Sequence, residues 1–170
     1  MTLAQLNALD EARFVALLGG VFEHSPWVAQ QAWQQRPFDS VEGLFRCMRD
    51  AVGDADANRQ VALILAHPEL AGREATQGQL SADSSSEQAR LGLLNLERAD
   101  FERIAALNRE YRQRFGFPCI VALRLHASRA GVLDEIQRRL GNEVQAELAN
   151  AMEQIGHIAH GRLEKLMTEN

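Results

Sequence analysis

Three short segments of the chain combine side chains that can do chemistry with residues that begin or end helices. They are His67-Pro68-Glu69-Leu70-Ala71-Gly72, Ser84-Ser85-Ser86-Glu87-Gln88 and Phe115-Gly116-Phe117-Pro118-Cys119-Ile120-Val121-Ala122-Leu123-Arg124. Helix ends and loops expose side chains and unpaired backbone N–H groups that a ligand can use. These three segments are therefore the candidate functional site.

His67 is the first candidate for proton transfer. An imidazole has an ordinary pKa of about 6.5, so it can donate or accept a proton near neutral pH. Pro68 disfavours helical backbone at His67, so the preceding apolar run should end there and present the imidazole. A carboxylate partner would set its tautomer. Spacing alone equally allows a structural histidine whose ring is satisfied by backbone at a helix C-terminus.

The other polar residues of these segments also have two interpretations each. Glu87 can be a functional carboxylate, or a first-turn residue that the helix dipole favours. Arg124 can bind a ligand, or be an ordinary surface cation after an apolar run. The serines at 84–86 can line a site, or form a flexible loop and cap. Local pattern leaves these alternatives open.

Other kinds of site find little support. His157 and His160 are three residues apart, but no third ligand is spaced to complete a metal site, and we predict none. Cys119 has no neighbouring histidine and lies in an apolar run, which favours packing over nucleophilic catalysis. The glycine patterns of nucleotide-binding loops and the Gly-x-Ser-x-Gly of serine hydrolases are absent from the sequence.

The elements that position these segments are predicted to be helices. Helical periodicity follows Asp10, Ser25-Pro26 and Ser40, and Asp100 should cap a helix that ends near Phe115. We assign the apolar run Val61–Ala66 to a helix, although a buried strand has the same pattern. Further helices are expected from Ser84 or Ser85, over about 131–140 and over 143–167, with the polar stretch 75–86 mainly a loop. The prediction is an all-α, single-domain, irregular bundle of about eight helices over residues 1–170.

Composition narrows the classes of function. The 170 residues are 46% hydrophobic and 24% charged, with a net charge of -5 and no clustering of Lys and Arg. Nucleic-acid binding is therefore not expected. Cys47 and Cys119 lie far apart in apolar runs, which favours reduced thiols in a cytoplasmic protein. No apolar run is long enough to predict insertion into a membrane, and no export signal is recognised.

The same segments belong to a series of motifs that extends over nearly the whole chain. The series comprises Phe22-Glu23-His24-Ser25-Pro26-Trp27, His67-Pro68-Glu69-Leu70-Ala71-Gly72, Ser84-x-x-Glu87-Gln88, Asn108-x-x-Tyr111-x-x-x-Phe115-Gly116-Phe117-Pro118, Arg139-Leu140-x-Asn142, Glu147, Gln154-Ile155 and Arg162-Leu163. In this order the motifs resemble those of the 2-oxo-4-hydroxy-4-carboxy-5-ureidoimidazoline (OHCU) decarboxylases. Those enzymes perform the last step of urate breakdown to (S)-allantoin.

The resemblance implies a role for each segment. It makes His67 the catalytic acid/base, and we expect Glu87 to act with it by holding the imidazole or the substrate hydroxyl in place. It implies a substrate pocket lined by Pro68, Ser84, Ser85, Ser86, Gln88, Cys119, Ile120, Val121, Ala122, Leu123 and Arg124. It also implies a cofactor-free reaction on a small-molecule substrate, and a homodimer. Cys119 and Leu91 depart from the residues that are usual in the family, which concerns pocket shape and local packing.

A second class of function fits the composition. A noncatalytic helical interaction module would use the proline-bounded apolar runs as a groove for a partner, with His67 as a structural cap. Such a module has no need of His67, Glu87 and Gln88 together at element ends, and would more often expose an apolar stripe.

Overall fold

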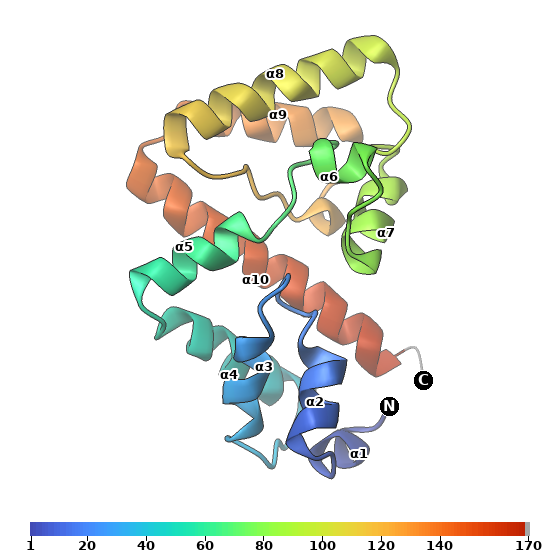
Figure 1. The fold of residues 1–170 in the computed structure, drawn as a ribbon, viewed down its shortest axis with the longest axis vertical. Coiled ribbons are helices and arrows are strands. Elements are labelled where there is room, and N and C mark those ends of the chain that lie inside the picture. The colour runs from blue at the N-terminus through green and yellow to red at the C-terminus, as the bar shows by residue number, and fades with distance from the viewer. Residues whose placement is uncertain (169–170) are drawn as a thin grey trace. The chain divides into compact units, whose positions relative to one another are not determined.

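The computed structural model describes residues 1–168, and these residues form helices and loops without strands (Figure 1). The ten α-helices are α1 (Leu3–Asn7), α2 (Glu11–Leu18), α3 (Pro26–Trp33), α4 (Val41–Gly53), α5 (Ala57–Leu65), α6 (Arg73–Thr76), α7 (Ala82–Arg90), α8 (Arg98–Phe115), α9 (Arg129–Arg139) and α10 (Val144–Thr168). A 3-10 helix, η1 (Leu123–Leu125), precedes α9. Eight of the α-helices have eight or more residues, which confirms the prediction of an all-α fold with about eight helices. In the described part of the chain, no helix is both long and apolar enough to span a membrane.

Several predicted helix ends are confirmed by their hydrogen bonds. The Asp10 carboxylate accepts from the Arg13 N–H at 2.8 Å, and the Ser40 hydroxyl accepts from the Gly43 N–H at 2.9 Å. Each satisfies an N–H that has no partner within its helix. Gly116 ends α8 with a left-handed φ of 82°, which glycine adopts without steric cost.

Two short helices fall outside the predicted set. Thr2 and Gln5 form a reciprocal capping box at the start of α1. The expected loop over 75–86 is wrong in part, because α6 occupies its beginning and α7 its end. Ser81 caps α7 by accepting from the Ser84 N–H at 3.2 Å, so this helix begins earlier than Ser84.

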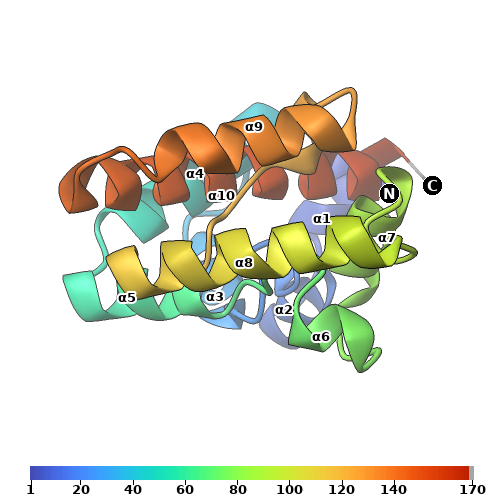
Figure 2. The ribbon, with the colours of Figure 1, turned by 90° about the horizontal axis from the view of Figure 1, so that it is seen from above.

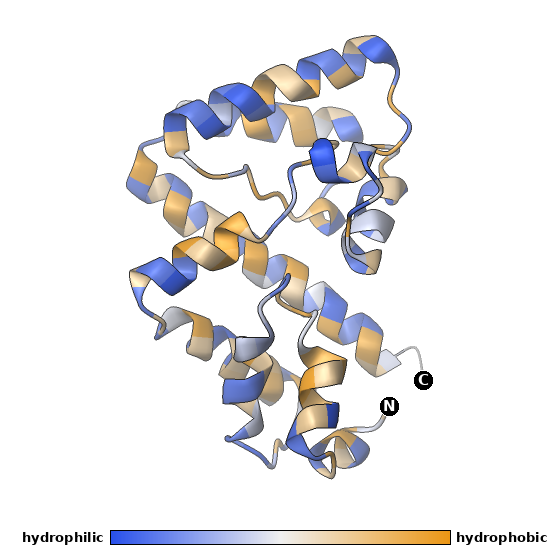
Figure 3. Ribbon diagram, in the orientation of Figure 1, coloured by the Kyte–Doolittle hydropathy of each residue, from blue (hydrophilic) through white to orange (hydrophobic). Residues whose placement is uncertain are grey.

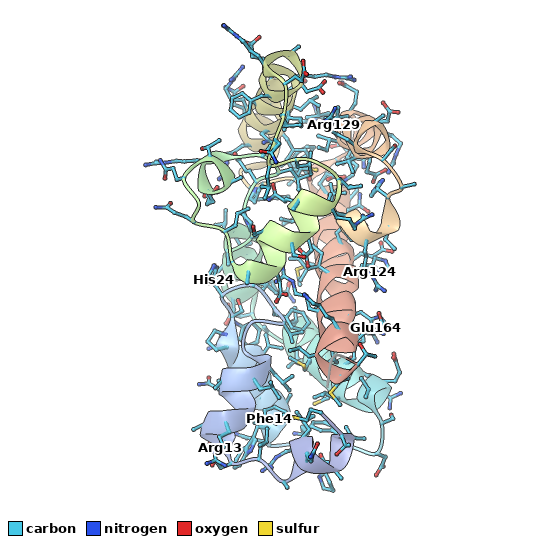
Figure 4. The ribbon with its side chains drawn as sticks, turned by 90° about the vertical axis from the view of Figure 1, so that its right-hand side faces the viewer. Arg13, Phe14, His24, Arg124, Arg129 and Glu164 are labelled. Atoms are coloured by element: carbon cyan, nitrogen blue, oxygen red, sulfur yellow. The ribbon has the colours of Figure 1, made fainter. Side chains whose placement is uncertain are left out.

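Other boundaries move by a few residues. Asp56 caps α5 by accepting from the Arg59 N–H at 3.0 Å, so the apolar run from Val61 to Leu65 is the second half of a longer helix and Ala66 is its C-cap. This half is coloured hydrophobic in Figure 3. Asp100 does not cap α8, which begins at Arg98; its carboxylate instead pairs with Arg129 at 2.6 Å. Figure 4 labels Arg129 at the start of α9.

Contacts within the chain group it into two compact units. One comprises Met1–Ala66 together with the chain from Gly156, and the other comprises His67–Ile155. Helix α10 contributes to both, because its residues up to Ile155 belong to the second unit. The assignment of the chain to a single domain stays a prediction.

The first unit is built on α2, α3 and α4, with α3 packed against both neighbours. Phe14 of α2, which Figure 4 labels, stacks on Phe38 with ring centroids 6.4 Å apart. A buried ion pair joins Glu23, before α3, to Arg162 of α10 at 2.7 Å. This pair ties the last helix to the beginning of the chain.

The second unit contains α8 and α9 side by side, as Figures 1 and 2 both show. Along α8, hydrophobic and hydrophilic residues alternate as expected for a helix with one buried face (Figure 3). Its buried residues include Ile104, Leu107, Asn108, Tyr111 and Phe115. All three candidate segments, from His67 to Arg124, lie within this unit.

Candidate active site

His67 lies just beyond the end of α5. The helix ends at Leu65, Ala66 is its C-cap, and His67 follows with only 6% of its surface exposed. Pro68, which is half-buried, begins the turn that leads to Gly72. The prediction that the helix ends at His67 is therefore confirmed to within two residues, and the presentation of its imidazole to a ligand stays a prediction.

The turn after His67 is held by Gln88 of α7. The Ala71 N–H donates to Gln88 Oε1 at 2.8 Å, and Gln88 Nε2 donates to the Glu69 carbonyl at 3.4 Å. Ala71 has a φ of 48°, a left-handed conformation that costs free energy for a residue other than glycine. The Gln88 amide thus stabilises an unusual backbone conformation close to His67, and its contact with substrate stays a prediction.

Helix α8 holds the same turn from a second side. Asn108 Nδ2 donates to the Leu70 carbonyl at 2.9 Å, and Arg112 Nε donates to Glu69 Oε1 at 2.7 Å. Gly72 allows the close approach, since a Cβ there would lie 2.6 Å from the Cβ of Glu69. The backbone that follows His67 is therefore fixed by polar contacts, of which those to Asn108 and Gln88 Oε1 are buried.

The 84–88 segment lies on α7, and its residues do not all face the same way. Ser84 and Gln88, four residues apart on one face of the helix, are buried. Ser85 and Glu87 are half-buried, whereas Ser86 is exposed. The structure thus groups Ser84, Glu87 and Gln88 and places Ser86 on the outer side of the helix.

Residues 119–123 form a buried run that has no helix before Leu123, where η1 begins. Arg90 at the end of α7 donates to the carbonyls of Leu123 and His126, the second at 3.1 Å. Helix α7 therefore binds both the turn after His67, through Gln88, and this run, through Arg90. One short helix connects all three candidate segments.

Arg124 and Cys119, at the two ends of this run, differ in their surroundings. Arg124 is an exposed residue of η1 (Figure 4). Cys119 is buried, and burial raises the pKa of its thiol to about 12. The thiol is therefore protonated at neutral pH, as expected for a packing residue. Contact between Cys119 and a ligand would involve its backbone.

A buried ionic cluster lies behind the 119–123 run. Arg139 Nε donates to Glu147 Oε2 at 2.9 Å, and Arg139 Nη1 donates to the Ile120 carbonyl at 2.6 Å. The Tyr111 hydroxyl also donates to Glu147. Arg139, Glu147 and Tyr111 are each no more than 1% exposed.

Glu147 carries the negative charge of this cluster. Burial alone would raise its pKa, but hydrogen bonds from Arg139, from Tyr111 and from two amides outweigh burial and hold the pKa below its ordinary value. The two amides belong to Asn142 and Asn150, which donate to Glu147 Oε1 at 2.7 and 2.8 Å. Glu147 is therefore ionised at neutral pH and balances the charge of Arg139.

Sequence reasoning assigned no role to several of these residues. Asn108, Tyr111, Arg139, Glu147 and Gln154 appeared only as members of motifs. Asn108 could have been singled out from the sequence, because it is a polar residue among the apolar residues of the buried face of α8. Arg90 could not have been singled out, since a charged residue at the end of a surface helix is ordinary.

His160, one of the two histidines considered for a metal, has other partners. Its ring nitrogens lie 3.3 Å from Glu42 and 3.5 Å from Glu164, and its ring packs edge-on against Phe45. Over residues 1–168, no group of three or more His, Cys, Asp or Glu side chains is arranged to hold a metal ion.

Comparison with known proteins places this arrangement in a family. The pattern of the OHCU decarboxylases matches residues 7–164. The chain belongs to the OHCU decarboxylase family. The resemblance drawn from the motifs is therefore confirmed.

OHCU decarboxylases of distant organisms are similar to the chain over nearly its full length. The one from Mus musculus is 37% identical, covering 98% of this chain and 93% of its own. The one from Halalkalicoccus jeotgali is also 37% identical, covering 98% and 92%. Among solved structures, an (S)-allantoin synthase is similar with a TM-score of 0.79 and 27% identity, covering 98% of this chain and 54% of that one.

In this OHCU decarboxylase, neither of the two residues that depart from the usual family pattern is exposed. The Cys119 thiol is part of the buried cluster around Tyr111. Leu91 is the half-buried C-cap of α7, beyond the turn that carries Glu87 and Gln88. Neither departure removes a polar side chain from the three candidate segments.

Proposed function

We propose that this chain is a carboxy-lyase that converts OHCU to (S)-allantoin in urate degradation. Membership of the OHCU decarboxylase family supports the reaction class. The observation that carries the proposal is that α7 binds both the turn after His67 and the 119–123 run. A proton donor and a set of backbone donors thereby share one rigid support, as a reaction that needs precise orientation requires.

The substrate supplies its own electron sink. Its carboxylate is attached to a carbon next to a ring C=N, which accepts the electron pair when the carbon–carbon bond breaks and carbon dioxide leaves. The protein then has to orient the carboxylate and deliver one proton to one face of the resulting ene-diamine. We therefore propose a reaction without metal, pyridoxal or thiamine.

His67 is proposed to deliver or relay that proton. Its burial beside Pro68 supports this role, because a buried imidazole can protonate one face of a bound intermediate without competition from bulk water. Glu87 would hold either the imidazole or the substrate hydroxyl. Backbone N–H groups of residues 119–123, with Gln88 and Arg124, would bind ureido and ring oxygens. Pro68, Ser84 and Ser85 would complete the pocket, whereas the exposed Ser86 would lie outside it.

The direct test generates the unstable substrate from urate in situ and follows circular dichroism. The chain should accelerate the appearance of optically active allantoin well above the spontaneous rate. Racemic product at the background rate would instead favour the noncatalytic interaction module.

Glu87→Gln should lower turnover by about a hundredfold, while substrate affinity changes less. The reason is that an amide cannot accept the same hydrogen bonds as a carboxylate at the step where charge moves. Steady-state kinetics by circular dichroism measures both quantities. The exposed neighbour Ser86→Ala is the control and should retain nearly full turnover, because Ser86 lies on the outer side of α7. A Glu87→Gln enzyme with normal turnover would remove Glu87 from the mechanism.

We also propose that the enzyme is a cytoplasmic homodimer. Both cysteines are free thiols, which suits a reducing compartment. Val61 and Leu65, one turn apart on α5, are 38% and 48% exposed, and a second subunit could cover such residues. Light scattering after gel filtration should give twice the mass of the chain, and a monomer at micromolar concentration would contradict the dimer.

A further inference from the structure

One edge of the 119–123 run is held by side chains from α9 and α10. Arg139 donates to the Ile120 carbonyl at 2.6 Å, and Gln154 Oε1 accepts from the Ala122 N–H at 2.8 Å. Glu147, the partner of Arg139, is seven residues before Gln154 and so lies on the same face of α10. Residue 121 is therefore flanked by two anchored peptide groups.

Peptide planarity fixes what these anchors do to Val121. In a trans peptide the C=O of one residue and the N–H of the next point in opposite directions. The Ile120 carbonyl points at Arg139, so the Val121 N–H points away from it. The Ala122 N–H points at Gln154, so the Val121 carbonyl points away from Gln154. Both polar backbone groups of Val121 are thus directed off the anchored edge.

The Val121 N–H has no acceptor among the described residues, although Val121 is only 4% exposed. Buried backbone N–H groups are nearly always paired, so such a donor indicates a partner that comes from outside the chain. The backbone N–H and C=O of Val121 lie side by side, so they can pair with a ligand group that offers a C=O to the N–H and an N–H to the C=O. Ureido and cyclic amide groups have this form.

We propose that Arg139 and Gln154 are positioning residues that aim the Val121 backbone N–H at an amide or ureido oxygen of the substrate. The inference rests on the proposed function and deepens it. The Glu147 cluster holds the Arg139 guanidinium rigidly, so the direction of the donor is set before substrate arrives. Neither Arg139 nor Gln154 touches the substrate itself.

Gln154→Met and Arg139→Lys test this role. Methionine keeps the length of Gln154 but cannot accept from Ala122, and lysine keeps the charge of Arg139 but lacks its fork of donors. In each variant KM should rise by about tenfold or more, with the pH dependence of kcat unchanged because His67 is unaffected. The control Asn150→Ala removes a partner of Glu147 and leaves both anchors, so its KM should stay normal.

A purely structural role predicts a different result. Partial unfolding lowers the active fraction and hence kcat, but leaves KM unchanged, and that result in Gln154→Met would overturn the proposal. This variant should fold, since Gln154 is half-buried and outside the ionic cluster.

A measurement without turnover separates this inference from the proposed function. In ¹⁵N-labelled wild type, titration with allantoin should shift the Val121 amide resonance, and Gln154→Met should abolish the shift at the same concentrations. If wild type has no decarboxylase activity, the proposed function fails but this titration still decides the role of the anchors. A Val121 resonance that does not move with allantoin in wild type, or moves equally in Gln154→Met, would refute it.

Discussion

Replacement of His67 by asparagine is expected to lower the rate of enzymatic (S)-allantoin formation by about a thousandfold. A positioned general acid typically contributes between about a hundredfold and ten-thousandfold, and asparagine cannot release a proton at neutral pH. The amide is close to imidazole in size and can satisfy part of its hydrogen bonding. The fold should therefore persist while chemistry stops.

Circular dichroism at far-ultraviolet wavelengths checks the fold of this variant, and the same instrument follows chiral product from substrate generated in situ. His126→Asn is a suitable control, because His126 ends η1 next to the 119–123 run but has no proposed part in the reaction. It should keep nearly full activity. Near-normal stereospecific product from His67→Asn would show that another group delivers the proton.

Glu147→Gln should produce the largest loss of stability among single polar substitutions considered, about 3–5 kcal/mol of the free energy of unfolding. The change leaves the Arg139 guanidinium buried without its counter-charge. It also turns one acceptor oxygen into an NH₂ group that faces other donors. Equilibrium urea unfolding at pH 7, followed by fluorescence and circular dichroism, measures the loss.

An exposed ion pair provides the control. Glu102→Gln breaks a surface pair with Arg98 and should hardly change stability, because such pairs are screened by water.

The loss of stability from Glu147→Gln should also depend on pH. Folding lowers the pKa of Glu147. The ionised carboxylate therefore stabilises the folded protein fully at pH values above the pKa of Glu147 in the unfolded chain, and this stabilisation is lost as the pH falls through its pKa in the folded protein. The difference between wild type and Glu147→Gln should therefore narrow in acid, and an equal difference at pH 7 and in acid would contradict this role.

Local signals in the sequence predicted those parts of the fold that depend on neighbouring residues. Asp10 and Ser40 cap helices as expected, and Gly116 ends α8, because each effect acts within one helical turn. Asp100 was assigned wrongly for a related reason. An aspartate in the first turn and an aspartate at the cap give the same sequence pattern, and only the contact with Arg129 distinguishes them.

The sequence indicated which residues to consider for the candidate site, but not the hydrogen bonds that bring their segments together. His67, Glu87 and the 119–123 run could be selected from residue type and position at element ends. The bonds that connect them depend on side chains distant in sequence, such as Gln88 on Ala71 and Arg90 on Leu123. No local pattern reveals such pairs, because each polar side chain has many surface alternatives of similar free energy.

The order of the two units along the chain has a consequence for synthesis. The unit that contains the candidate site is one uninterrupted stretch, whereas the other needs both Met1–Ala66 and the part of α10 that follows Ile155. Arg162, which pairs with Glu23, also donates to the Gly20 carbonyl, 142 residues away in sequence. On the ribosome, Glu23 therefore emerges well before Arg162, and its buried carboxylate has to wait for α10 to gain this partner. The part made first is completed last, and truncation at the end of α10 should leave the N-terminal helices exposed to proteases.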